Sequence, residues 1–183
     1  IGNKISNILL MPVLALGSVL AAYVGQNIGA GNGARARQAY RVSRNIGFVI
    51  AVVGSLILLP FREELVALLS NDGATQTAAV EYMFWVLITQ PLMSLFQNYL
   101  GVFNGSGKTI YAFWMSTARL WLVRLPLIML FKYFTTVGST GVWYAMVLSN
   151  SIILFLGAFL YRRVDFTPCR AVEEEGQAMF ENV

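Results

Sequence analysis

Gly25-Gln26-Asn27-Ile28-Gly29-Ala30-Gly31-Asn32-Gly33 separates two long apolar stretches of this 183-residue chain. Glycine permits tight turns and close helix approach because it has no Cβ. The residues that follow carry four arginines and no acid: Arg35, Arg37, Arg41 and Arg44. Arginine and lysine in short loops between membrane spans concentrate on the cytoplasmic side. We therefore predict that residues 26–45 form a cytoplasmic loop between two membrane-spanning helices.

Two glycine-rich segments resemble phosphate-binding loops, but their spacing argues against a nucleotide site. A dinucleotide-binding turn needs G-x-G-x-x-G after a strand, whereas Gly29, Gly31 and Gly33 run G-x-G-x-G after a long apolar stretch. The segment Gly105-Ser106-Gly107-Lys108-Thr109 ends like a P-loop, but Val102 occupies the position of the first P-loop glycine. We expect no nucleotide site.

The composition is that of a membrane protein. Hydrophobic residues make up 57% of the chain and charged residues 12%, with a mean hydropathy of +0.63. Soluble domains average roughly 45–50% apolar and about 25% charged residues. The chain has no histidine, and its single cysteine, Cys169, lies outside the apolar stretches. Because an active site needs a nucleophile with a base, or a metal, we predict that the chain is not an enzyme and holds no metal or cofactor.

Five apolar stretches are long enough to cross a hydrocarbon core, which takes about 20 helical residues. They cover approximately residues 5–25, 46–68, 78–103, 110–134 and 141–161. Since none alternates with period two, a β-barrel is not expected. The predicted fold is all-α, a polytopic membrane helix bundle in residues 1–163 with a polar tail in 164–183. The chain begins at Ile1, almost inside an apolar stretch, and we expect it to be a piece of a longer protein.

Basic residues orient these spans. A cytoplasmic 26–45 loop also places the 104–109 loop and the 164–183 tail in the cytoplasm. That side then holds eight basic residues: Arg35, Arg37, Arg41, Arg44, Lys108, Arg162, Arg163 and Arg170. The opposite side keeps Lys4, Arg62 and Lys132. We interpret the net charge of +4 as orientation in a plasma (inner) membrane and not as nucleic-acid binding.

Polar residues inside the third predicted span share one helix face. At about 100° per residue, Gln90, Ser94, Gln97 and Asn98 fall within an arc of roughly 100°. Unsatisfied polar groups in lipid cost several kcal/mol each, so this stripe faces either a water-filled substrate cleft or another helix. We predict the cleft.

The fourth predicted span carries Arg119 and Arg124. Five residues turn about 140° around an α-helix, so the two arginines are not expected on one stripe. Arg124 is expected either to face the cleft or to anchor a neighbouring helix. Arg119 is expected to extend toward the membrane surface.

Four segments fall where the hydropathy places loops and helix ends. They are Gly25-Gln26-Asn27-Ile28-Gly29-Ala30-Gly31 with Ala36, Gly101-Val102-Phe103-Asn104-Gly105-Ser106-Gly107-Lys108-Thr109, Arg124-Leu125-Pro126-Leu127, and Gly141-Val142-Trp143-Tyr144-Ala145 with Ser149-Asn150. In this order they resemble the loop after helix eight, the connection between helices ten and eleven, a motif of helix eleven and the start of helix twelve in multidrug and toxic compound extrusion (MATE) transporters. The resemblance extends over the whole chain.

The resemblance implies five helices of a six-helix lobe, helices eight to twelve of a twelve-helix transporter whose N-terminal part is missing here. It implies export of cationic or amphipathic compounds, driven by sodium ions or protons through membrane carboxylates. This chain departs from that pattern, because Met93 stands about where some members carry an aspartate and Glu81 is the only acid of its helix. We expect the ion site in the missing part.

Two alternatives remain open. A flippase for lipid-linked oligosaccharides has the same architecture and could hold phosphate with Arg119 and Arg124. The other alternative is an inactive, truncated membrane protein. The expected partners are the lipid bilayer, a small-molecule substrate and the rest of the transporter.

Overall fold

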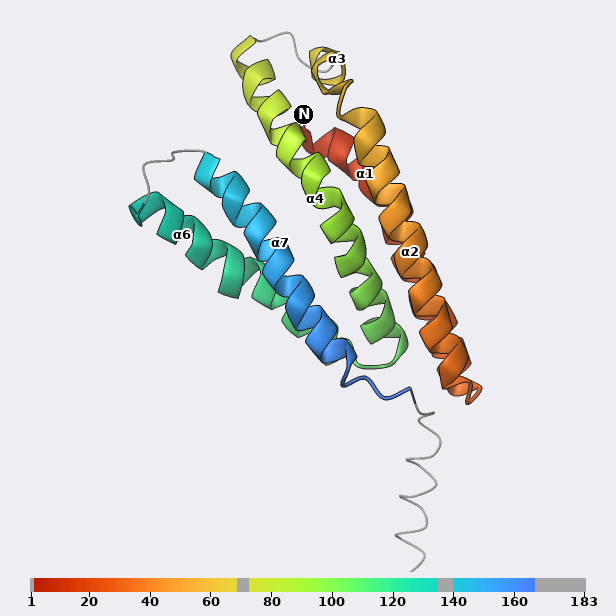
Figure 1. The fold of residues 1–183 in the computed structure, drawn as a ribbon. Coiled ribbons are helices and arrows are strands. Elements are labelled where there is room, and N and C mark those ends of the chain that lie inside the picture. The colour runs from red at the N-terminus through yellow and green to blue at the C-terminus, as the bar shows by residue number, and fades with distance from the viewer. Residues whose placement is uncertain (1, 69–72, 135–139, 167–183) are drawn as a thin grey trace, which may run out of the picture.

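The computed structural model describes residues 2–68, 73–134 and 140–166, and every regular element in these ranges is a helix (Figure 1). In chain order the elements are α1 (Gly2–Gly29), α2 (Gly33–Leu58), α3 (Arg62–Ala67), α4 (Gly73–Gly105), α5 (Thr109–Thr117), the π-helix η1 (Ala118–Arg124), α6 (Leu125–Phe134) and α7 (Thr140–Tyr161). The predicted all-α fold is confirmed.

Five helical stretches in the described ranges are long and apolar enough to cross a membrane. They are Met11–Gly29, Gly33–Leu58, Ala79–Gly105, Thr109–Phe131 and Gly141–Tyr161. The α1–α2 turn, the α4–α5 turn and the end of α7 lie at the same end of the bundle, at the bottom of Figure 1. The five predicted spans are therefore present as a polytopic bundle.

The boundaries of the second span differ from the prediction. Helix α2 begins at Gly33 and not near residue 46, so most of the expected 26–45 loop is helical and its four arginines lie on the first turns of α2. At its other end α2 stops at Leu58, before Pro60, and the short helix α3 follows. Proline has no N–H to donate and disfavours helical continuation through the preceding residue.

The α1–α2 connection is short because the glycine segment closes α1 with a Schellman motif. The Gly31 N–H donates to the Ile28 carbonyl at 2.9 Å, and the Asn32 N–H donates to the Asn27 carbonyl at 2.7 Å. Gly31 has a φ of 77°, in the left-handed region that this motif requires at the position after the cap. The glycine-rich segment therefore forms a tight helical turn.

Helices α1 and α4 pack side by side with almost no side chain between them. A Cβ on Gly101 would lie 2.6 Å from the Gly17 carbonyl oxygen, and one on Gly105 would lie 2.4 Å from that of Ala21. Further along, a Cβ on Gly25 would lie 3.2 Å from the Gly105 carbonyl oxygen. Small residues spaced by four on both helices thus form one continuous seam, as expected for helix association in lipid.

Helix α2 packs against α4 through small and hydroxylated residues. The Ser43 hydroxyl donates to Asn98 Oδ1 at 2.7 Å, and Asn98 Nδ2 donates to the Ser94 carbonyl at 2.9 Å. Farther along the pair, the Ser55 hydroxyl donates to the Leu87 carbonyl at 2.9 Å. In lipid these polar groups find no water, so their bonds to one another fix how α2 sits on α4.

The first residues after α7 do not behave as the predicted solvated tail. Val164 and Phe166 are buried, and the Phe166 ring lies 5.0 Å from the Arg37 guanidinium and 6.0 Å from the Tyr161 ring. The apolar character of Val164 and Phe166 accounts for this packing against α2 and α7. The rest of the predicted tail, from residue 167, lies outside the described residues.

A substitution at the α1–α4 seam tests its role. We expect Gly105→Ala to lower the stability of the full-length protein by about 1–3 kcal/mol, because the new methyl meets the backbone of Ala21. Gly29→Ala is the matched control, since a Cβ there has no atom within 4 Å. Thermal denaturation in detergent measures both. Equal melting temperatures for the two variants would contradict a stabilising role of the close α1–α4 contact.

A double-mutant cycle tests the contact between α2 and α4. Ser43→Ala, Asn98→Ala and the double variant should reveal a coupling of about 0.6 kcal/mol, the mean found for hydrogen bonds between membrane helices, and of at most about 1.7 kcal/mol. Equilibrium unfolding of the full-length protein gives the four free energies. A coupling of zero would show that the bond between these side chains does not stabilise the bundle.

Candidate functional site

The predicted cleft residues of α4 occupy different environments. Gln90, Ser94 and Asn98 are buried, with exposed fractions of 3%, 0% and 0%, whereas Gln97 is half-buried. Asn98 bonds to Ser43, and a Cβ on Gly47 of α2 would lie only 2.8 Å from the Ser94 hydroxyl oxygen. Ser94 and Asn98 thus contact α2, which differs from the cleft prediction, because α2 covers that part of the stripe.

The predicted loop motif is a structural turn. Asn27 accepts the closing Schellman bond through its carbonyl and donates from Nδ2 to the Tyr23 carbonyl at 2.8 Å, while the Gln26 carbonyl accepts from Ala30 at 3.0 Å. Gly31 supplies the left-handed conformation and Gly25 the close approach to α4. Gly29 makes no such close approach, since an added Cβ there has no atom within 4 Å. The motif therefore shapes the helix ends.

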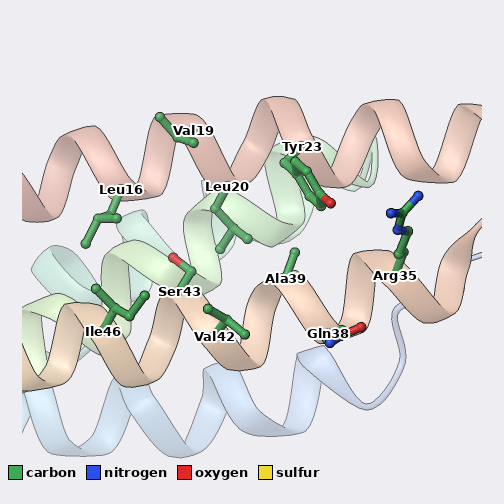
Figure 2. A pocket seen from close by; sticks show the side chains of 10 residues that line it. All are labelled: Leu16, Val19, Leu20, Tyr23, Arg35, Gln38, Ala39, Val42, Ser43 and Ile46. Carbon is green, nitrogen blue, oxygen red and sulfur yellow. The ribbon is translucent and has the colours of Figure 1, made fainter.

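A groove of about 460 Å³ runs along the outside of α1 and α2 (Figure 2). Its walls are mainly apolar, with Arg35 and Gln38 toward the α1–α2 turn. The lining residues are Leu16, Val19, Leu20, Tyr23, Arg35, Gln38, Ala39, Val42, Ser43 and Ile46. Sequence reasoning missed this groove, because exposed apolar residues in a membrane span look the same whether they face lipid or a ligand.

The fourth span is interrupted by the π-helix η1, which carries both membrane arginines. The Leu125 N–H after η1 donates to the Leu120 carbonyl, five residues back. This bond pattern places residues five apart about one turn from each other, unlike the α-helix assumed from sequence. The prediction that Arg119 and Arg124 do not share a stripe was therefore wrong.

Arg119 reaches α4 and not the membrane surface. Its Nη1 donates to the Met93 sulfur at 3.0 Å, and its guanidinium carbon lies 4.3 Å from the centroid of the Phe96 ring. The expectation that Arg119 extends to the surface was wrong, because sulfur and an aromatic face offer the cation contacts inside the bundle.

Arg124 is half-buried and lies within electrostatic range of Tyr82, which is on α4 like Met93 and Phe96. On the same stretch of α4, Tyr82 pairs with Trp143 of α7 and Trp85 pairs with Tyr144, each with ring centroids 5.1 Å apart. Both cations of η1 therefore face α4, Arg119 near Met93 and Phe96 and Arg124 near Tyr82.

Comparison with known proteins identifies relatives of this chain. A family model described as MatE matches residues 1–130. The chain is 22% identical over 161 residues to the probable multidrug resistance protein YoeA of Bacillus subtilis, covering 87% of this chain and 35% of that protein. It is 25% identical over 167 residues to an FAD transporter of Shewanella oneidensis, covering 89% of this chain and 36% of that protein. The chain thus spans about a third of the length of these relatives.

Two solved structures share the fold. An inward-facing multidrug resistance MATE family transporter of the MOP superfamily superposes with a TM-score of 0.81 at 19% identity, over 90% of this chain and 38% of that one. The MATE transporter ClbM in complex with Rb⁺ gives a TM-score of 0.81 at 21% identity, over 96% of this chain and 40% of that one. Since the MatE model matches well over half of the residues, the chain belongs to the MatE family, the multidrug and toxic compound extrusion transporters.

Proposed function

We propose that this chain forms part of a secondary active efflux transporter that exports cationic or amphipathic compounds by ion-coupled antiport and alternating access. The observation that carries the proposal is the similarity of the five-span bundle to an inward-facing MATE family transporter, with a TM-score of 0.81 over 90% of the chain. Relatives named as probable multidrug resistance proteins support the substrate class.

Within such a transporter, the chain would supply helices eight to twelve, five helices of one six-helix lobe. Its coverage of 38% and 40% of the two solved transporters is compatible with that share. The rest of the transporter is then the principal partner of this bundle, together with the lipid bilayer.

The proposed coupling ion is sodium or a proton, and its site lies outside the described residues. Among the described residues of α4, the acid is Glu81, whose side chain is exposed, and Met93 contacts Arg119. A coupling carboxylate needs a protected position in the membrane, where its protonation or ion binding can alternate with substrate. Glu81 does not occupy such a position.

On the substrate side, we retain Gln90, Gln97 and Arg124 as proposed cleft residues. Gln97 and Arg124 are half-buried in this bundle, so part of each side chain is accessible to a ligand or to the second lobe. Ser94 and Asn98 belong to the packing between α2 and α4.

We place the α1–α2 turn, the α4–α5 turn and the C-terminal tail in the cytoplasm. Arg35, Lys108 and Glu63 are all exposed, so a cysteine at each position is accessible to reagent. In a Cys169→Ser background, a membrane-impermeant maleimide should label positions 35 and 108 from the cytoplasm and position 63 from the opposite side. Labelling of 35 and 63 from one side would contradict the orientation. Asp72 and Thr136, expected opposite to the cytoplasm, lie outside the described residues.

Transport by the full-length protein tests the function itself. In proteoliposomes, ethidium should move against its gradient when a sodium or proton gradient is imposed and should stop when the ionophore for that ion is added. The control is an equal amount of empty liposomes under both gradients. Ethidium movement that ignores both gradients would rule out antiport, and its absence would rule out export of this class of cation.

A second candidate is the movement of an anionic compound. Arg119 and Arg124 lie inside the fourth span, and intramembrane charges usually mark a functional site. The lipid-linked oligosaccharide flippase is one form of this candidate, since its cargo carries phosphate. The relative named as an FAD transporter makes a phosphate-bearing dinucleotide another.

A further inference from the structure

Within the part of the chain that the structure describes, the fourth span holds two cations that form no ion pair with an acid. Arg119 and Arg124 fall between Thr109 and Phe131, the limits of that span. The ion pair found among the described residues joins Arg62 to Glu63 instead, at the far end of α2. The Nε atoms of both arginines are buried and make no hydrogen bond to the described part of the chain. Because an uncompensated charge in lipid is costly, these guanidiniums require a counter-charge from elsewhere.

The π-helix turns both side chains toward the same neighbouring helix. Arg119 contacts Met93 and Phe96, and Arg124 interacts with Tyr82, so both extend from η1 to α4. At about 100° per residue, these three α4 residues fall within roughly 60° of one another, on one face of the helix. In η1 the two arginines lie five residues apart, about one turn of a π-helix, so their side chains leave the same side of the helix. One anion between them would offset both charges.

The groups around the arginines define which anion fits. A guanidinium has five N–H donors in a planar fork, and the Met93 sulfur is a weak acceptor for one of them. The remaining donors match the oxygens of phosphate or carboxylate. Tyr82, which lies in electrostatic range of Arg124, packs against Trp143 of α7, and aromatic rings there suit a ligand with a planar ring.

We propose that Arg119 and Arg124 form an anion site between η1 and α4 that binds the phosphate or carboxylate of an aromatic compound carried by this transporter. The proposal rests on the second candidate function above, the movement of an anionic compound, and specifies the chemical class of that compound. The π-helix has a defined role in this site, because an α-helix would direct the two arginines about 140° apart.

Riboflavin 5′-phosphate and riboflavin provide a matched pair of probes, since they share one fluorescent ring and differ by the phosphate. Binding is measured by fluorescence quenching with the full-length protein in phosphatidylcholine nanodiscs. We expect the phosphate compound to bind about tenfold or more tightly than riboflavin, the gain typical of charge-assisted hydrogen bonds. Equal affinities for the two compounds in the wild-type protein would overturn the site without any variant.

Variants identify the residues. Arg119→Gln and Arg124→Gln should each reduce the preference for the phosphate compound to near one, and Arg124→Lys should restore part of it by returning the charge without the planar fork. Arg62→Gln is the matched control, because Arg62 also lies over an aromatic ring, Phe84 at 5.3 Å, but has Glu63 beside it. Should both glutamine variants melt earlier yet keep the full preference, the arginines would serve packing only and the proposal would fail.

Two further arms separate the alternatives. Nanodiscs with phosphatidylglycerol test a lipid source of the phosphate, and loss of the riboflavin 5′-phosphate preference in these discs alone would assign the site to a lipid headgroup and overturn the substrate role.

Gradient-driven ethidium transport by the wild-type protein reports the proposed function independently. Ethidium transport with equal affinities for the two flavins would refute the anion site alone, whereas phosphate preference without gradient dependence would refute antiport alone.

Discussion

The approach of α1 to α4 is the contact on which the rest of the bundle depends. In lipid there is little hydrophobic force between helices, so association relies on close packing and on hydrogen bonds. Gly17, Ala21 and Gly25 on α1 meet Gln97, Gly101 and Gly105 on α4, with distances that leave no room for an added methyl group at Gly101 or Gly105. This backbone contact sets the relative height of the two helices, and the turns that follow each of them lie at the same end of the molecule (Figure 1).

The polar groups of the bundle divide into two kinds according to what satisfies them. Ser43, Ser55 and Asn98 bond to protein atoms within the α2–α4 interface and hold one helix arrangement. The Nε groups of Arg119 and Arg124 make no hydrogen bond to the described residues. Arg119 contacts the Met93 sulfur and the Phe96 ring, and Arg124 lies near Tyr82. The first kind is suited to architecture. The second kind is suited to a ligand that arrives and leaves, as a transporter requires.

Aromatic residues join α2, α4 and α7 at the end of the bundle where the α1–α2 and α4–α5 turns lie. Tyr40 of α2 stacks on Tyr161 of α7 with centroids 4.4 Å apart and lies 5.9 Å from Tyr99 of α4. Phe166 extends this cluster beyond α7, and a Cβ on Gly33 would lie 2.4 Å from its carbonyl oxygen. The chain after α7 is thus tied to the start of α2.

The sequence by itself determined the membrane class, the five spans and a turn within the glycine-rich segment, because hydropathy over about 20 residues and the conformational freedom of glycine are local properties. It also identified the family, through motifs at the helix ends. Only the tertiary structure decided that Ser94 and Asn98 face α2, since a polar stripe looks the same whether it meets water or a helix. The π-helix likewise required the fold: a single extra residue per turn brings Arg119 and Arg124 to one side, and the residue types of η1 alone do not distinguish that geometry from an α-helix.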